Sequence, residues 1–222
     1  RIGLKTKDRI KLTPLAATGT AFMFPGQSDH GSGLFSAVSK LCEETNYQRD
    51  VANALGNDVL SELFRAPRRI NENLFSSLCT ALLSIDCFHS IDRKFHDDVQ
   101  FFIGYSIGQW TALHLAGALE FKDLIRIIAH RANLMDNCMR KGDYAMMAVI
   151  GIHEEKIEAY CQDLSRKSKY TAISNYNSLG QYTVSGERDA LALLREKLMR
   201  HKPKKCTMLP FSGAWHCSLL DE

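Results

Sequence analysis

Residues 99–108 have the sequence VQFFIGYSIG, in which an apolar run leads into a serine flanked by glycines. The run 99–103 predicts a buried strand and residues 109–119 predict a helix, so Ser106 lies at a strand-to-helix turn. This G-x-S-x-G pattern is typical of a nucleophile elbow, where glycines permit the sharp turn that exposes the serine hydroxyl. The start of the following helix presents unpaired N–H groups to a developing oxyanion. Ser106 is therefore a candidate nucleophile.

The elements around this turn alternate between strands and helices. Residues 21–24 predict a second short buried strand, closed by Pro25-Gly26. Helical patterns cover 34–42, 51–64, 73–88, 109–119 and 124–139. Because strands that alternate with helices form parallel sheets, we expect an α/β-hydrolase-like fold whose sheet is covered on both faces.

The pattern changes near residue 142. Strands at 144–150, 171–175, 182–185 and 206–209 and helices at 154–164 and 189–199 give the order β-α-β-β-α-β. This order predicts an inserted ferredoxin-like small subdomain. The expected domains are a tail at 1–20, a large α/β subdomain from 21–141 and 209–222, and a small one at 142–208. We expect further chain after residue 222, because the sequence stops just after a candidate functional loop.

Composition narrows the classes of function. The 222 residues are 45% hydrophobic and 24% charged with a net charge of +3, which are ordinary globular values. The sequence has no basic stripe interleaved with aromatic residues, so it does not predict a nucleic-acid partner. It also has no apolar segment that predicts a membrane span or a secretory signal. The seven cysteines include no C-x-x-C pair and predict reduced, mostly buried thiols and no zinc site. We expect a cytoplasmic protein.

A serine needs a base to take its proton, and eight histidines are available. His114 is too far along the helix to reach back to Ser106. Five others are in polar or helical contexts and are interpreted as solvated surface residues, namely His89, His96, His130, His153 and His201. His216, in a loop just after a predicted strand, and His30, in a weaker context, remain as alternatives.

Two further residues stand out. Gln27 follows the first strand, where α/β folds place ligands, and its backbone N–H is a candidate oxyanion donor, although Pro25-Gly26 is also typical of a plain turn. Arg131 interrupts an apolar helical face, where an unpaired charge is costly. Its partner is either an internal Asp or Glu, or a substrate carboxylate that matches the guanidinium in a bidentate pair.

Taken together, seven segments in order resemble the malonyl-CoA:acyl-carrier-protein transacylase family over residues 21–222. These segments are Phe24-Pro25-Gly26-Gln27, Gly104-Tyr105-Ser106-Ile107-Gly108-Gln109, Ala116-Gly117-Ala118-Leu119, Arg131 with Leu134-Met135, residues 145–151, residues 175–181 with 184–186, and Ser212-Gly213-Ala214-Trp215-His216. They resemble the family's F-P-G-Q, G-H-S-x-G-E, A-G-A-L, R-x-x-L/F-M, A-M-A-A-V-x-G, N-x-N-S-P-x-Q with V-I-S-G, and G-A-F-H patterns respectively.

The resemblance implies an acyltransferase. Ser106 would carry the malonyl group as an ester and His216 would act as general base and then general acid. Backbone N–H groups of Gln27 and Ile107 would form the oxyanion hole, and Arg131 would hold the malonyl carboxylate. Trp215 would narrow the acyl pocket, and Asn175 would contribute to substrate binding. The donor would be malonyl-CoA and the acceptor the phosphopantetheine thiol of an acyl carrier protein, with no bound cofactor or metal.

Several positions depart from the family pattern. Tyr105 replaces the usual His, Gln109 the usual Glu, and Asn73 a usual Gln, while residues 28–30 are Ser-Asp-His instead of Gly-Ser-Gln. The sequence leaves fatty-acid and polyketide synthesis open, with a lean toward polyketide-type members. Two other functions also remain open: a serine acyl-hydrolase or thioesterase, and a non-catalytic module that docks carrier domains.

Overall fold

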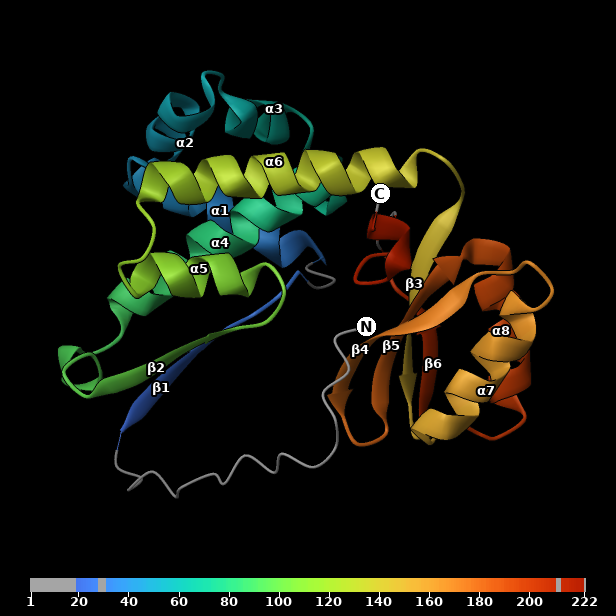
Figure 1. The fold of residues 1–222 in the computed structure, drawn as a ribbon. Helices are drawn as coiled ribbons and strands as arrows, with labels where there is room; N and C mark the ends of the chain where they lie inside the picture. Colours follow the sequence, from blue (N-terminus) through green and yellow to red (C-terminus); the bar gives the residue numbers. More distant parts are fainter. Residues whose placement is uncertain (1–18, 28–30, 211–212, 222) are drawn as a thin grey trace.

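The computed structural model describes residues 19–27, 31–210 and 213–221. The predicted tail up to residue 18, the alternative base His30 and Ser212 lie outside these ranges. The elements are β1 (Thr20–Phe24), α1 (Gly31–Glu44), α2 (Tyr47–Leu55), α3 (Val59–Arg65), η1 (Pro67–Asn71), α4 (Asn73–Ser90), η2 (Arg93–Phe95), β2 (Val99–Gly104), α5 (Gly108–Leu115), α6 (Phe121–Met139), β3 (Tyr144–Ile150), α7 (Glu154–Ser165), β4 (Thr171–Ser178), β5 (Gln181–Glu187), α8 (Arg188–Met199), β6 (Lys205–Met208) and η3 (Ser218–Leu220). Figure 1 shows them in two groups, a large lobe of β1, β2 and α1–α6 and a small lobe of β3–β6, α7 and α8.

The large lobe contains a parallel pair of strands. β1 pairs with β2 in a register that aligns Phe24 with Gly104, so both strands end at the same edge. Helices cover one face of this pair (Figure 1), and Phe22 and Phe102 on that face pack around Phe88 of α4. The shared edge brings the loop after β1 beside the turn after β2.

On the opposite face of this pair, large apolar side chains of the described residues are exposed. Met23 is 76% exposed, and Phe101 and Ile103 are each 46% exposed. The prediction of a sheet covered on both faces is therefore wrong for the described residues, because α4 and α5 pack on the same side. The α/β class and the parallel pairing are as predicted.

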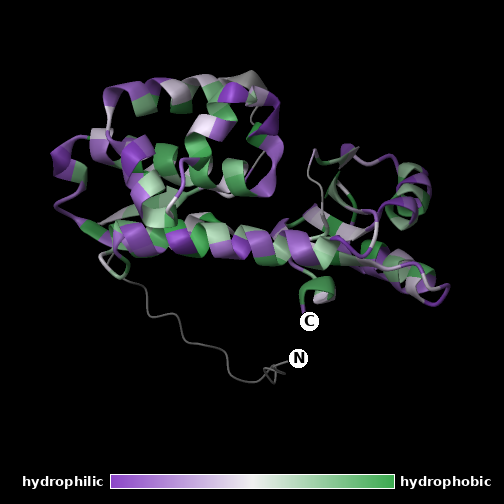
Figure 2. Cartoon of the chain, turned by 90° about the horizontal axis from the view of Figure 1, so that it is seen from above, coloured by the Kyte–Doolittle hydropathy of each residue, from purple (hydrophilic) through white to green (hydrophobic). Residues whose placement is uncertain are grey.

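A helical core supports this pair from the covered side. Its fully buried members include Leu60, Leu78, Leu82, Leu124 and Ile128, which come from α3, α4 and α6. Figure 2 shows hydrophobic and hydrophilic residues sharing most helices, as expected for helices buried on one face. Among the described residues, no helix has the length and apolar character needed to cross a bilayer.

Two predicted helices are shorter in the structure because glycines end them. The helix predicted over 51–64 is split into α2 and α3 at Gly56, which adopts a left-handed conformation with φ of 78° and closes α2 as a cap. The helix predicted over 109–119 ends at Leu115, and Gly117 follows with φ of 80°.

His96 is not the solvated residue that the sequence predicted. Its ring centroid lies 4.4 Å from that of Phe88, and its Nε2 is buried without a hydrogen-bond partner among the described residues. The polar neighbours in sequence favoured exposure, but the loop before β2 folds the ring onto the aromatic cluster. The seven cysteines are free thiols; Cys79, Cys161 and Cys206 are buried and Cys87 is exposed.

The small lobe is a four-stranded antiparallel sheet in the order β4-β5-β3-β6. Its elements follow the predicted order along the chain. Helices α7 and α8 contribute to its buried core, in which Met147 and Val149 of β3 pack among Ile157, Leu191 and Leu194. Leu209 then continues from β6, its N–H donating to Met146 O at 2.8 Å, and leads the chain back toward the large lobe.

Candidate active site

Ser106 occupies a tight turn between β2 and α5. Its backbone φ is 52°, in the left-handed region that non-glycine residues rarely adopt. A Cβ on Gly108 would lie 2.4 Å from Phe24 O, and one on Gly104 would lie 2.2 Å from Gln109 N. Only glycine fits at these two positions, so the turn has the form that the sequence pattern predicted.

His216 lies beside this serine although 110 residues separate them. Ser106 Oγ and His216 Nε2 are 2.9 Å apart, which is hydrogen-bond distance. Two contacts hold the loop that carries the histidine: Ser185 Oγ of β5 donates to Trp215 O at 2.8 Å, and Ala214 N donates to Met139 Sδ of α6 at 3.1 Å. Both lobes therefore position the imidazole.

The surroundings of His216 favour its neutral form. Partial burial of its ring lowers its pKa, although the residue as a whole is exposed, and the positive charge of Arg131 lowers it further. A neutral imidazole is the form that accepts a proton from serine. No described carboxylate hydrogen-bonds this ring or forms an ion pair with it.

The guanidinium of Arg131, on α6, also lies beside Ser106. Its Nη2 donates to Ser106 Oγ at 3.4 Å, whereas its Nη1 is buried without a hydrogen-bond partner among the described residues. None of the ion pairs of the described residues includes Arg131. Burial alone lowers its pKa. Of the two partners considered from sequence, the internal one is therefore not found, because no described Asp or Glu forms an ion pair with Arg131.

Gln27 and Ile107, the predicted backbone donors, both lie close to Ser106. Gln27 follows β1 and lines the same small cavity as Ser106, and Ile107 begins the turn into α5. Neither backbone N–H has a hydrogen-bond partner among the described residues. The Gln27 side chain is bonded to α4, because its Nε2 donates to Asn73 O at 3.2 Å and Asn73 Oδ1 at 3.1 Å.

Asn73 is a residue whose role the sequence reasoning missed. It is 5% exposed. Its oxygens accept from Gln27, and its Nδ2 donates to Asp136 Oδ1 at 3.0 Å. Burial raises the pKa of Asp136. These bonds join the loop after β1 to α4 and α6. The available signal was its departure from the family's usual Gln, which indicated a polar position without naming its partners.

The cavity at the serine is small. It has a volume of about 60 Å³ and is lined by Gln27, Tyr105, Ser106, Met146, Asn175, Thr183, Leu209, Trp215 and His216. The predicted substrate-binding residues Asn175 and Trp215 are thus both in its wall. Trp215 is 5% exposed. On the α6 side, Arg131 and His216 also border a wider, mostly apolar cavity of about 670 Å³.

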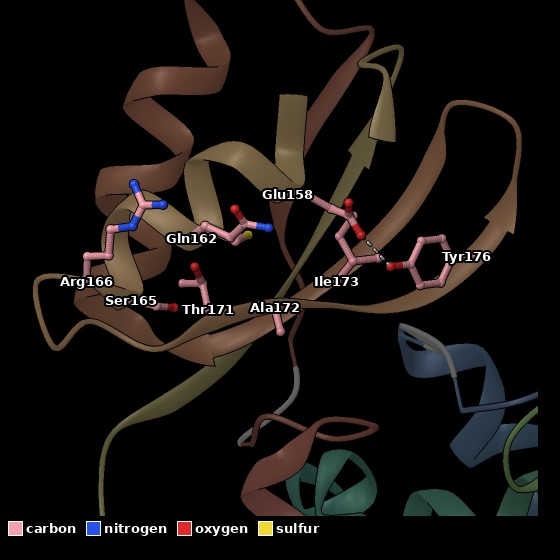
Figure 3. Close-up of a pocket in the computed structure, with 9 residues that line it drawn as sticks. Glu158, Gln162, Ser165, Arg166, Thr171, Ala172, Ile173 and Tyr176 are labelled. Atoms are coloured by element: carbon pink, nitrogen blue, oxygen red, sulfur yellow. Dashed lines mark hydrogen bonds between the residues drawn. The ribbon is translucent and has the colours of Figure 1, made fainter. Parts of the chain in front are cut away.

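A separate cavity of about 560 Å³ lies in the small lobe between α7 and β4 (Figure 3). Tyr176 Oη donates to Glu158 Oε1 across it at 3.2 Å. It has no residue in common with the cavity at Ser106. Among the described residues, no cluster of His, Cys, Asp and Glu has the geometry to hold a metal ion.

Comparison with known proteins finds similar sequences among acyltransferases. No family model matches the chain. It is 25% identical over 207 residues to the malonyl CoA-acyl carrier protein transacylase of Escherichia coli strain K12, covering 91% of this chain and 66% of that protein. It is 28% identical over 202 residues to the enzyme of the same name from Staphylococcus aureus strain MRSA252, covering 90% and 65%. The chain is thus similar over nine tenths of its length to malonyl-CoA:acyl-carrier-protein transacylases.

A solved transacylase structure has a similar fold. The malonyl-CoA:acyl carrier protein transacylase from Helicobacter pylori superposes with a TM-score of 0.74 at 26% identity, covering 92% of this chain and 66% of that one. The chain therefore spans slightly less than two thirds of the length of the transacylases that it matches.

Proposed function

We propose that this chain transfers a malonyl group from CoA to the phosphopantetheine thiol of an acyl carrier protein. Ser106 Oγ attacks the thioester carbonyl while His216 Nε2 takes its proton, and CoA leaves as the thiol with that proton. The carrier thiol then gives its proton to His216 and attacks the ester, and the proton returns to Ser106 Oγ as the malonyl group departs. Backbone N–H groups of Gln27 and Ile107 stabilise the oxyanion of both steps.

The observation that carries this proposal is the state of Arg131. A buried guanidinium with a free Nη1 beside the nucleophile is costly unless a ligand pairs with it. A malonyl ester on Ser106 presents a carboxylate two carbons from its carbonyl, within the same small space. A fork of two N–H donors suits a carboxylate better than it suits the methyl group of an acetyl ester.

We also propose a division of the chain into two subdomains. Residues 21–141 and 209–222 form the α/β-hydrolase-like large subdomain and residues 142–208 the ferredoxin-like small subdomain. The strand order β4-β5-β3-β6 and the return of the chain after β6 support this division. Under this division, residues of both subdomains line the cavity at Ser106, among them Gln27 and Thr183.

The alternative of a serine hydrolase shares Ser106 and His216. Hydrolase triads usually include an acid that orients the histidine, and none contacts His216 among the described residues. A hydrolase that acts on uncharged acyl groups also has no use for Arg131. The non-catalytic docking alternative has no use for the 2.9 Å serine–histidine contact or for the left-handed φ at Ser106.

Incubation with malonyl-CoA followed by intact-mass analysis tests the proposal. The wild-type chain is expected to gain one malonyl group, and Ser106→Ala to gain none. Ser90→Ala is the matched control, because Ser90 Oγ donates to Asp86 O on the far end of α4 and does not line the cavity. Addition of a carrier protein should then move the group to the carrier thiol. Release as free malonate instead would favour the hydrolase, and a folded chain without adduct would favour the docking module.

A further inference from the structure

Tyr105 immediately precedes the nucleophile and connects the two lobes. Its N–H donates to Phe24 O at 3.0 Å, and its carbonyl accepts from Gly108 N at 2.9 Å, so its backbone is fixed to β1 and α5. A Cβ on Gly26 would lie 2.6 Å from Tyr105 Cδ1, which shows that the ring packs directly over that glycine. The side chain therefore leaves the elbow in one defined direction.

That direction ends in the small lobe. Tyr105 Oη donates to Asn177 Oδ1 of β4 at 2.8 Å, and Asn177 Nδ2 donates to Thr183 Oγ1 of β5 at 3.4 Å. Thr183 and Tyr105 both line the small cavity around Ser106. A chain of hydrogen bonds thus runs from the residue beside the nucleophile to the opposite wall of its cavity.

The hydroxyl stays a donor at neutral pH. The residue is 48% exposed, and its partial burial raises the pKa of Tyr105 above its ordinary value, so the phenol remains protonated. The acceptor Asn177 is an amide and does not titrate in this range. The contact is therefore present throughout the working pH range of a histidine base.

We propose that Tyr105 is a positioning residue, whose hydrogen bond to Asn177 holds β4 against the elbow and keeps water from the acyl ester on Ser106. This inference rests on the proposed function, because it concerns the ester intermediate of that reaction. When the contact is broken, the cavity widens on the β4 side. A water oxygen then attacks the ester carbonyl, His216 takes its proton, and the proton passes to Ser106 Oγ as free malonate leaves.

The test is the lifetime of the malonyl ester on the full chain without any carrier protein. Tyr105→Phe keeps the ring over Gly26 and removes only the hydroxyl, and Asn177→Ala removes the acceptor. Because one hydrogen bond contributes about 0.5–1.5 kcal/mol, each change is expected to shorten the ester half-life by about 2- to 10-fold. The double variant should decay no faster than the single ones, since both remove the same contact.

Tyr176→Phe is the matched control. It removes a tyrosine hydroxyl that also bonds within the small lobe, to Glu158, but at the separate cavity of Figure 3. Its ester half-life should equal that of the wild type. The unfolding midpoint of every variant is measured as well. A general loss of stability would lower the midpoint, whereas loss of the positioning contact shortens the ester half-life of Tyr105→Phe and Asn177→Ala only.

The outcomes separate the two proposals. Equal ester half-lives for wild type and Tyr105→Phe, or additive effects in the double variant, would overturn the role of Tyr105 and leave the transferase proposal intact. Absence of any adduct on the wild-type chain would overturn the transferase proposal and this inference with it.

Discussion

Replacing Arg131 by Gln should change which acyl group the chain accepts. The structure gives the guanidinium a buried Nη1 without a partner among the described residues and no neighbouring carboxylate there. A malonyl carboxylate would supply the missing partner, and removal of one member of such a desolvated pair typically costs about 2–5 kcal/mol. That range corresponds to a loss of about 30- to 4,000-fold in the rate constant for malonyl adduct formation per unit of donor concentration.

Acetyl-CoA should respond in the opposite sense. An acetyl ester leaves the wild-type guanidinium unpaired, so the variant should acylate from acetyl-CoA at least as well as the wild type does. The assay follows adduct formation from each donor by intact mass under single-turnover conditions. Arg126→Gln is the control, because it removes a charge from the same helix where Arg126 Nε donates to Ala54 O at 3.0 Å. Equal losses with malonyl-CoA and acetyl-CoA would refute the carboxylate role.

Three other predictions follow from the same geometry. Because the pKa of His216 is lowered, the rate of malonyl adduct formation should fall on the acid side only below the ordinary histidine pKa of about 6.5, since the neutral base persists to lower pH. A rate–pH profile at low malonyl-CoA concentration measures this apparent pKa, and a value above about 6.5 would contradict the prediction. Gly108→Ala should cost about 1–3 kcal/mol of unfolding free energy, since its Cβ would lie 2.4 Å from Phe24 O; urea unfolding measures the loss, with Gly33→Ala, which meets nothing within 4 Å, as the control. Trp215→Ser should enlarge the small cavity and remove a preference of about 10- to 200-fold for malonyl-CoA over methylmalonyl-CoA; competition between the two donors reads it out, and an unchanged ratio would remove Trp215 from the acyl pocket.

The local part of the site was predictable from sequence because its chemistry lies within a few consecutive residues. A serine between glycines at a strand-to-helix boundary specifies the left-handed turn at Ser106 with no knowledge of distant contacts. The same holds for the small lobe, where alternation of short strands and helices fixes the order of elements. Helix ends were less predictable, because Gly56 closes α2 by adopting a left-handed conformation that the apolar pattern does not reveal.

The long-range part was not predictable from residue patterns alone. Tyr105 and Asn177 are 72 positions apart, and Asn73 and Asp136 are 63 apart, so no local period relates either pair. The position of His96 shows the same limit, since most of its neighbours in sequence are charged but its ring lies against Phe22 and Phe88. Likewise, β2 has a nearly continuous apolar sequence typical of burial on both faces, yet the described helices all pack on one face.

The electrostatics of the site link substrate binding to base strength under the proposed function. In the free protein, partial burial of the ring and then the charge of Arg131 lower the pKa of His216 and favour the neutral imidazole. A malonyl carboxylate paired with Arg131 would offset that charge, so the pKa of His216 would rise when the donor is bound. The imidazole would then become a stronger base at the moment when Ser106 must lose its proton. An acetyl donor leaves the charge uncompensated, so a single buried guanidinium would disfavour it twice, through the missing ion pair and through the weaker base.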